Sequence, residues 1–368
     1  MTHRIPFLRL HPGADAEAAD AAIRRVMDRG WFVLGPEVDA FESEFARASG
    51  LAHVVGTGNG TDAIALLLRG LGIGAGDEVI TSPLSAAFTA LAIVMAGARP
   101  VFADIDPLRL TIHPETVEPL IGPRTAAILP VHLYGQPADM AALAAVAKRH
   151  GLAVVEDCCQ AHLATCGGRP VGSFGEGAAF SFYPTKNLGG VGDGGAACTD
   201  DAALAARLRA LRNGGQTARN EHTAAGVNSR LDEIQAAVLR VRLGSLRART
   251  HRRRDLARHY RTRLADAPVH MPPECDAGHV YHLFPIRTAL RDRVRGLLDA
   301  AGIGTMIHYP TPVTRQPAIA PYEPAACPVA ETVCSTALSL PLHPGLSEAD
   351  VDIVADVVRR VAPAERTP

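Results

Sequence analysis

The sequence predicts an α/β protein in which a mostly parallel sheet is covered by helices and a smaller α/β domain follows. Short apolar segments with the character of strands alternate with helical segments from about residue 52 to about residue 200. Beyond that point the helices become longer and more polar, and strand-like segments become sparse. We therefore expect a large domain with an N-terminal segment over residues 1–245 and a small C-terminal domain over residues 246–368.

The expected elements of the large domain alternate along the chain. We predict strands at 52–55, 78–81, 100–104, 126–131 and 152–157, and helices at 63–68, 86–96 and 138–149. Short apolar strands that are separated by helices are typical of a parallel sheet buried on both faces. Ligands bind such sheets at the carboxyl ends of the strands, and Asp157 ends one of them. We therefore expect this carboxylate to point into the binding crevice.

The second part of the chain has its own expected elements. We predict helices at 201–212, 231–263 and 347–361, and strands at 280–287 and 303–308. The middle helix is rich in arginine, and we interpret it as a solvated helix face that links two domains rather than as a nucleic-acid patch. Its arginines include Arg247, Arg249, Arg252, Arg253, Arg254 and Arg258.

Composition and charge exclude several classes of function. The 368 residues include 37 Lys and Arg against 38 Asp and Glu, so the net charge of -1 gives no field that would recruit nucleic acid or an anionic membrane. The mean hydropathy is +0.08, and no apolar run is long enough to span a bilayer. The first residues lack a secretory apolar region, so we expect a cytoplasmic protein. The 7 cysteines form no Cys-x-x-Cys pair, which argues against a disulfide framework and against a metal site.

Lys186 is the first candidate for catalysis. It is the only lysine in a long apolar and glycine-rich stretch, with a strand before it and a glycine run after it. Such surroundings desolvate an amine and lower its pKa, as a Schiff-base lysine requires. The alternative is a surface lysine beside a loop, and the spacing alone leaves both interpretations open.

Two glycine-rich segments could bind phosphate. The segment 189–195 contains a formal G-x-G-x-x-G, but it follows a lysine and leads into a strand, so we reject a dinucleotide site. The segment 56–62 lies between a strand and a helix that begins near Thr61. The N–H groups and the dipole at a helix N-terminus favour a phosphate dianion. The alternative is an ordinary helix cap formed by Thr61 or Asp62.

The segment 156–162 places a carboxylate where the nitrogen of a pyridine ring could be met. An aspartate held as an anion at this edge would keep that nitrogen protonated, and the ring could then act as an electron sink. Glu156 and Asp157 point to opposite faces of a strand, so they are not expected to bind one metal ion. His162 has no second ligand at a suitable spacing.

The order and spacing of these segments resemble the DegT/DnrJ/StrS family of nucleotide-sugar aminotransferases. The resemblance covers nearly the whole chain and is carried by the segments 58–63, 131–135, 156–162, 181–195, 212–215, 226–237 and 302–310. It implies the fold type I architecture of enzymes that use pyridoxal 5'-phosphate (PLP), with a mostly parallel sheet of the seven-stranded type. It also implies a transaminase that works in amino-sugar biosynthesis.

The resemblance implies a role for each matching residue. Lys186 would form the Schiff base with PLP and shuttle the proton, Asp157 would pair with the ring nitrogen, and Gln160 would bind the phenolic oxygen. The cofactor phosphate would be held by Gly60, Thr61 and Ser181 and, from the other subunit of a homodimer with shared active sites, by Asn228. His308 and Tyr309 would lie near the sugar nucleotide.

The sequence departs from the family pattern at two places. Relatives usually carry an aromatic residue over the cofactor ring, whereas Ala86 occupies that position here and Phe88 follows two residues later. Relatives also usually have a glycine after the histidine, where this chain has Leu163. The first departure would weaken retention of the cofactor, because an aromatic stack contributes about 0.5–1.5 kcal/mol.

The implied reaction transfers the amino group of L-glutamate to a nucleotide-linked keto-sugar. Three alternatives stay open. A keto-inositol could be the acceptor, which would place the enzyme in an aminocyclitol pathway. A PLP-dependent sugar dehydratase shares the fold, but in that branch a histidine replaces the lysine, and Lys186 is present. A regulatory protein could bind PLP without turnover.

Overall fold

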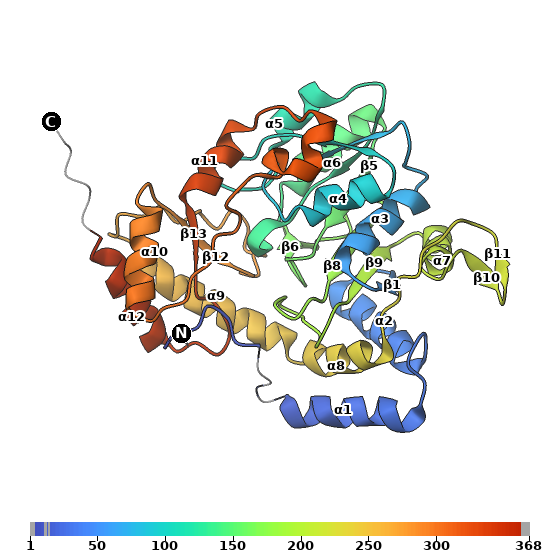
Figure 1. Cartoon of the computed structure of the whole chain (residues 1–368), viewed down its shortest axis with the longest axis horizontal. Helices are drawn as coiled ribbons and strands as arrows, with labels where there is room; N and C mark the ends of the chain where they lie inside the picture. The colour runs from blue at the N-terminus through green and yellow to red at the C-terminus, as the bar shows by residue number, and fades with distance from the viewer. Residues whose placement is uncertain (1–3, 11–12, 14, 362–368) are drawn as a thin grey trace.

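The computed structural model describes residues 4–10, 13 and 15–361 and is shown in Figure 1. Its centre is a sheet of 7 strands in the order β1-β9-β8-β5-β4-β2-β3. β9 is antiparallel to both of its neighbours, and the remaining pairs are parallel, so the sheet is mostly parallel as predicted. The strands are β1 (His53–Thr57), β2 (Glu78–Thr81), β3 (Arg99–Phe102), β4 (Thr125–Leu129), β5 (Ala153–Asp157), β8 (Gly177–Ser181) and β9 (Gly195–Thr199).

Helices cover both faces of this sheet. Successive residues of β8 show the alternation, because Ala178 and Phe180 pack with α2 and α8, whereas Ala179 packs with α3 and α7. This two-sided burial explains why the strands are short and apolar. The helices are α1 (Ala16–Arg29), α2 (Pro36–Ser49), α3 (Gly60–Gly70), α4 (Phe88–Met95), α5 (Pro114–Val117), α6 (Met140–His150), α7 (Ala202–Leu211) and α8 (Glu233–Leu243).

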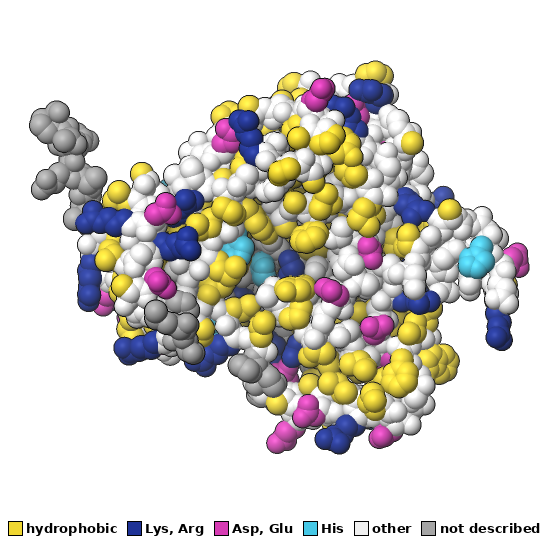
Figure 2. All heavy atoms as spheres, in the orientation of Figure 1, with side chains coloured by type: hydrophobic (Ala, Val, Ile, Leu, Met, Phe, Trp, Pro, Cys, Tyr) yellow, Lys and Arg dark blue, Asp and Glu magenta, His cyan; other side chains and the backbone are white. Residues whose placement is uncertain are grey.

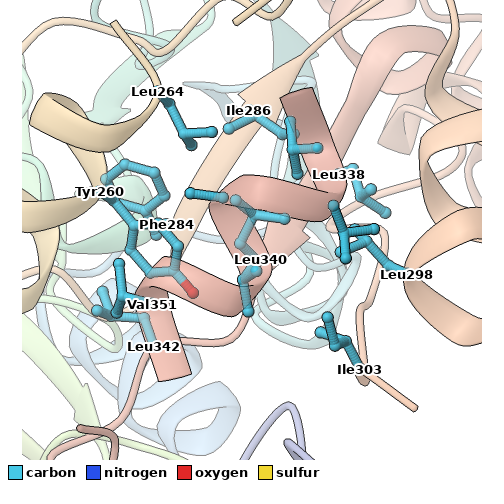
Figure 3. Packing of buried hydrophobic residues seen from close by; sticks show 14 of the residues in the cluster. Tyr260, Leu264, Phe284, Ile286, Leu298, Ile303, Leu338, Leu340, Leu342 and Val351 are labelled. Atoms are coloured by element: carbon cyan, nitrogen blue, oxygen red, sulfur yellow. The ribbon is translucent and has the colours of Figure 1, made fainter. Parts of the chain in front are cut away.

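A second unit is built from the C-terminal part of the chain. It contains the antiparallel pair β12 (Phe284–Arg287) and β13 (Ala337–Leu340) and the helices α9 (Leu246–Arg263), α10 (Arg291–Ala300), α11 (Pro328–Thr336) and α12 (Glu348–Arg359). Figure 3 shows its core, where Tyr260, Phe284 and Leu340 face one another. Ile5 also belongs to this core and pairs with Ile303, so the N-terminal segment packs on the C-terminal unit. The division at residue 245 stays a prediction.

Short elements complete the described chain. They are the strand pairs β6 (Thr165–Cys166) with β7 (Arg169–Pro170) and β10 (Gln216–Ala218) with β11 (Glu221–His222), together with single turns of 3₁₀-helix at Glu118–Leu120, Leu133–Gly135 and Val313–Arg315 and a longer one at Pro317–Tyr322. In Figure 1 the β10–β11 hairpin extends away from the body of the molecule. No helix of the described residues combines the length and the apolar character that crossing a membrane requires.

Two expected elements are wrong in detail. The helix predicted over 231–263 is two helices, because α8 ends at Leu243 and α9 begins at Leu246. Gly244, a poor helix former, lies at this break. The strand predicted at 303–308 is reduced to isolated pairings of Ile303 with Ile5 and of Met306 with Ser339.

Candidate active site

A cavity of 750 Å³ lies at the carboxyl ends of the sheet strands. Its wall includes Gly60 after β1, Ser85 after β2, Val131 after β4, Asp157 at the end of β5 and Ser181 at the end of β8. Parallel strands bring these ends to one edge although the residues are far apart in sequence. The expectation that Asp157 points into the crevice is therefore met by its place in the cavity wall.

The cavity unites most of the residues that the sequence singled out. Its lining includes Gly60, Thr61, Asp157, Gln160, Ser181, Lys186 and Tyr309. Asn228 and His308 are not part of this lining. Asn228 is exposed, and its backbone pairs with Asn213.

Two donors fix the carboxylate of Asp157, which is only 4% exposed. The Thr89 hydroxyl donates to Oδ2 at 2.8 Å, and the backbone N–H of Cys159 donates to Oδ1 at 3.0 Å. The Thr89 hydroxyl is also 3.0 Å from the hydroxyl of Ser85. Thr89 could not be singled out from the sequence, because nothing in its local pattern indicates a contact with a strand end 68 residues away.

Lys186 follows β8 in a tight turn in which its backbone N–H donates to the carbonyl of Tyr183 at 2.9 Å. Burial lowers the pKa of its amine, and the nearby Cys159 and Asp157 oppose that effect in part. A lowered pKa increases the neutral, nucleophilic fraction of an amine. The other lysine of the chain, Lys148, lies on the exposed last turn of α6.

The N-terminus of α3 begins at the cavity. The helix has a side-chain cap, but the cap is Asn59, whose side chain accepts the N–H of Asp62 at 2.8 Å, and not Thr61 or Asp62 as the alternative to a phosphate site had it. A side chain on Gly60 would lie 2.7 Å from the Cys159 sulfur and 2.9 Å from Cβ of Ser181. Glycine therefore lets the helix start approach Ser181 closely, and a helix N-terminus beside a hydroxyl is an arrangement that suits a phosphate.

Gln160 connects the cavity floor to the C-terminal unit. Its Nε2 donates to the hydroxyl of Tyr309 at 3.0 Å, and its Oε1 accepts the backbone N–H of Tyr134 at 2.7 Å. The hydroxyl of Tyr134 in turn donates to the carbonyl of His308. Burial raises the pKa of Tyr309 to about 12, so this hydroxyl stays protonated at neutral pH.

His308 lies behind Tyr309. Its Nδ1 is 3.0 Å from the hydroxyl of Ser339, and its ring stacks on Phe7 with the ring centres 5.6 Å apart. Burial and then Lys186 lower the pKa of His308 to about 4, so the ring is neutral at pH 7.

Both residues of the first family departure line the cavity. Ala86 offers only a methyl group, and Phe88 is the first residue of α4. The Phe88 side chain is 64% exposed within one chain. Its aromatic ring is therefore available at the cavity wall but is not held there by packing.

One buried cluster has the residue types of a metal site. His132, Glu156 and Cys158 bring their ligand atoms within 4.8 Å of one another. However, Nε2 of His132 bonds Glu156 at 3.0 Å, and its Nδ1 accepts the N–H of Ala138 at 3.0 Å. Glu156 also accepts the backbone N–H groups of Gly172 and Phe174 at 2.8 and 2.7 Å. Since the ligand atoms of His132 and Glu156 are already bonded, these two residues fix loops around the site.

Comparisons with known proteins agree with this geometry. Residues 14–359 match the DegT/DnrJ/EryC1/StrS aminotransferase family. The dTDP-3-amino-3,4,6-trideoxy-alpha-D-glucose transaminase of Streptomyces venezuelae is 48% identical over 367 residues, which cover 98% of this chain and 97% of the relative.

Solved structures show the same architecture. DesV of S. venezuelae in complex with a ketimine intermediate is 49% identical, and the match covers 97% of this chain and 98% of DesV with a TM-score of 0.94. NtdA of Bacillus subtilis with bound cofactor PMP is 31% identical, and the match covers 98% of this chain and 86% of NtdA with a TM-score of 0.91. This chain has the fold type I architecture and belongs to the DegT/DnrJ/EryC1/StrS aminotransferase family.

Proposed function

We propose that this protein is a PLP-dependent aminotransferase that moves the amino group of L-glutamate onto a nucleotide-linked keto-sugar. One observation carries the proposal. The amine of Lys186, whose pKa is lowered by burial, lines the same cavity as the carboxylate of Asp157, which two donors hold in place. The relative that is 48% identical over nearly the whole chain is named as a transaminase of a dTDP-linked amino sugar, which favours a sugar nucleotide over a keto-inositol.

The residues at the cavity fit the groups of PLP. The start of α3 with Gly60 and Thr61, together with Ser181, would bind the phosphate. Asp157 would pair with the ring nitrogen, and Lys186 would hold the cofactor covalently. The second N–H of the Gln160 amide would reach the phenolic oxygen, since the first is bonded to Tyr309. When bound, the cofactor supplies an electron sink next to the transferred nitrogen.

Lys186 would carry the proton during the transfer. Its Nζ would take the proton from the substrate carbon that bears the amino group. It would then give a proton to the carbon on the other side of the transferred nitrogen. A base for this task works best when its pKa lies near the working pH, and burial moves Lys186 in that direction. Thr89 would keep the Asp157 carboxylate oriented throughout.

Tyr309 and His308 would face the sugar. The Tyr309 hydroxyl, fixed by Gln160, lies in the cavity wall and can donate to a sugar oxygen. His308 precedes Tyr309 and would help to hold it in place, and its neutral ring would add no charge beside the sugar.

A homodimer would complete the site. Asn228 does not line the cavity of its own chain. In the sequence it follows the β10–β11 hairpin, which extends away from the body of the molecule (Figure 1). Met95, Phe88 and Tyr183 are more than half exposed and all line this one cavity, and exposed apolar side chains that gather at one place are typical of a surface that a partner covers. In the dimer that we propose, the partner's Asn228 would contact the phosphate.

The test is the glutamate half-reaction. Protein loaded with PLP should convert L-glutamate to 2-oxoglutarate with one turnover per site and a loss of the visible cofactor band, with no acceptor present. Lys186→Ala should lose both signals, whereas Lys148→Ala should keep both. A band that glutamate leaves unchanged would indicate a protein that binds the cofactor without turnover.

The acceptor is tested in the second half-reaction. The aminated protein should be returned to its starting spectrum by a 3-keto dTDP-sugar. Restoration by a keto-inositol instead, with no response to the sugar nucleotide, would overturn the proposed substrate class.

A further inference from the structure

A second cavity of 520 Å³ meets the first one at Lys186. Thr185 and Lys186 belong to the linings of both cavities. The second cavity is otherwise formed by the N-terminal segment, by the turn after Lys186, by α8 and α9 and by the segment 343–345. Figure 2 shows that the drawn face of the molecule is hollowed near its centre.

The second cavity is strongly basic. Its lining includes Arg9, Arg242, Arg249 and Arg253 besides Lys186, and Asp15 is the only carboxylate among those lining residues that the structure describes. Asp15 is already paired with Arg242 at 3.1 Å and with Arg249 at 2.9 Å. One carboxylate between two guanidinium groups leaves the cavity with a surplus of positive charge.

Arg253 is the residue of this cavity whose surroundings point most clearly to an anion. It is 5% exposed, and its Nη1 donates to the carbonyl of Leu342 at 2.8 Å and to those of Tyr281 and His282 at 3.3 Å. It has no carboxylate partner within the described part of the chain. Burial and then the neighbouring Arg249 lower its pKa to about 10. A buried guanidinium without an anion is costly, so its setting favours a bound anion.

The first cavity lacks such charges. Among the described residues that line it in one chain, Lys186 is the only lysine or arginine, and Asp62, Asp157 and Asp193 contribute carboxylates. Both substrates of the proposed reaction carry at least two negative charges, which these carboxylates would repel. Within one chain, the cationic groups that could accept such charges lie in the second cavity, on the other side of Lys186.

We propose that the arginine-lined cavity is the subsite for the anionic part of the substrate whose reacting end lies at Lys186. The ligand chemistry is a pair of negative charges, supplied either by the diphosphate of the sugar nucleotide or by the carboxylates of glutamate. Arg249 and Arg9 provide the guanidinium donors that can reach such a ligand, and the buried Arg253 adds its field. This inference rests on the proposed function.

The experiment measures anion binding to the PLP-loaded protein, in which the phosphate cradle is already filled. Inorganic diphosphate and glutarate are titrated separately by calorimetry, at low and at raised salt. At least one should bind, and binding should weaken with salt. Arg249→Gln should weaken that binding roughly tenfold or more, because a charge-assisted bond is lost. Asp15→Asn should bind the same anion as tightly or more tightly.

The control is Arg258→Gln, which removes the same charge from an exposed position of α9 outside the cavity. It should bind the anion like the parent protein. If Arg249→Gln does not fold, as judged by its Tm, Arg9→Gln takes its place, because Arg9 is exposed. Diphosphate binding alone would assign the subsite to the sugar nucleotide, and glutarate binding alone would assign it to the amino donor.

Two results would overturn the inference. One is that neither anion binds, and the other is that Arg249→Gln and Arg258→Gln bind it equally well. The glutamate half-reaction separates this inference from the proposed function. A protein that converts glutamate but binds no anion through Arg249 keeps the function and loses the subsite. One that binds the anion through Arg249 and never converts glutamate keeps an anion site but loses the proposed function, and with it the assignment of that site to a substrate.

Discussion

Thr89 orients Asp157 from a different part of the chain, and its removal should weaken the site. In Thr89→Val the carboxylate loses its 2.8 Å bond, and a hydrogen bond to a charged group contributes about 1.5–3 kcal/mol. We expect 2-oxoglutarate formation from glutamate to slow roughly tenfold or more. Ser85→Ala is the matched control, since Ser85 contacts Thr89 but not Asp157. Equal rates in all three proteins would contradict the role of Thr89.

His162 makes the fold sensitive to acid. Its Nε2–H donates to the carbonyl of Ser181 at 2.9 Å, and burial lowers its pKa to about 3, further helped by Lys186. In the unfolded chain a histidine titrates near 6.5, so the unfolded state binds the extra proton between about pH 6.5 and pH 3. As the pH is lowered through this window, the free energy of unfolding should therefore decrease, by up to about 1.4 kcal/mol per pH unit for this residue.

The measurement is urea unfolding of the parent and of His162→Gln from pH 7 to pH 4.5. The variant should start less stable, because the histidine packs against Phe180 and Phe182, but it should lose less stability on acidification. Other groups titrate equally in both proteins and cancel. Parallel curves would show that His162 does not contribute to the acid sensitivity.

The single residues differ in how far the sequence could predict them. Lys186 and Asp157 could be singled out because a strand end and a glycine run mark their surroundings. Thr89 and the His132–Glu156 pair could not, because their partners lie 68 and 24 residues away and only the sheet brings them together. Arg253 lies in the stretch interpreted as a solvated helix face, yet it is buried, and its guanidinium bonds backbone carbonyls of the segments 281–282 and 342.

At the scale of elements, the start of α3 depends on the absence of a side chain at Gly60. In Gly60→Ala the new methyl group would overlap Cys159 and Ser181, and such overpacking costs about 1–3 kcal/mol. We expect the dissociation constant for PLP to rise and the free energy of unfolding to fall. Gly296→Ala in α10 is the control, because nothing lies within 4 Å of its new methyl group.

The control variant Gly296→Ala should bind PLP like the parent protein. Its free energy of unfolding should be unchanged or higher by up to ~1 kcal/mol, since alanine favours a helix interior more than glycine does. Urea unfolding and titration with PLP give both quantities. If Gly60→Ala bound PLP like the parent protein, the phosphate cradle would lie elsewhere.

Elements with strong local patterns were predicted well. The strand at 78–81 coincides with β2, and the strand at 152–157 and the helix at 347–361 agree with β5 and α12 within two residues at each end. Elements whose limits depend on tertiary packing were not. The break at Gly244 separates two helices that read as one polar helix, and α1 and α2 were not anticipated, although their apolar stripes pack against α8.

At the scale of the whole molecule, the exposed apolar side chains around the first cavity should be a subunit interface. Met95 is 55% exposed, and Met95→Lys should place a charge in this interface. We expect the dimer to dissociate at micromolar concentration and the glutamate half-reaction to slow, because the partner's Asn228 is withdrawn. Analytical ultracentrifugation gives the oligomeric state.

Leu108→Lys is the matched control, because Leu108 is 53% exposed but does not line the cavity. It should remain dimeric. A parent protein that sediments as a monomer with full activity would contradict the shared active site, and the role of Asn228 would fall with it.

The central claim is the covalent attachment of the cofactor at Lys186, and one measurement tests it most directly. Protein loaded with PLP is reduced with borohydride, digested and mapped by mass spectrometry. Lys148 and Lys186 are the two lysines of this chain, so they are the two side chains at which the label can be attached. We predict a stoichiometric label on the peptide that contains Lys186 and none on the peptide that contains the exposed Lys148. A label on Lys148, or no stable label at all, would contradict the account.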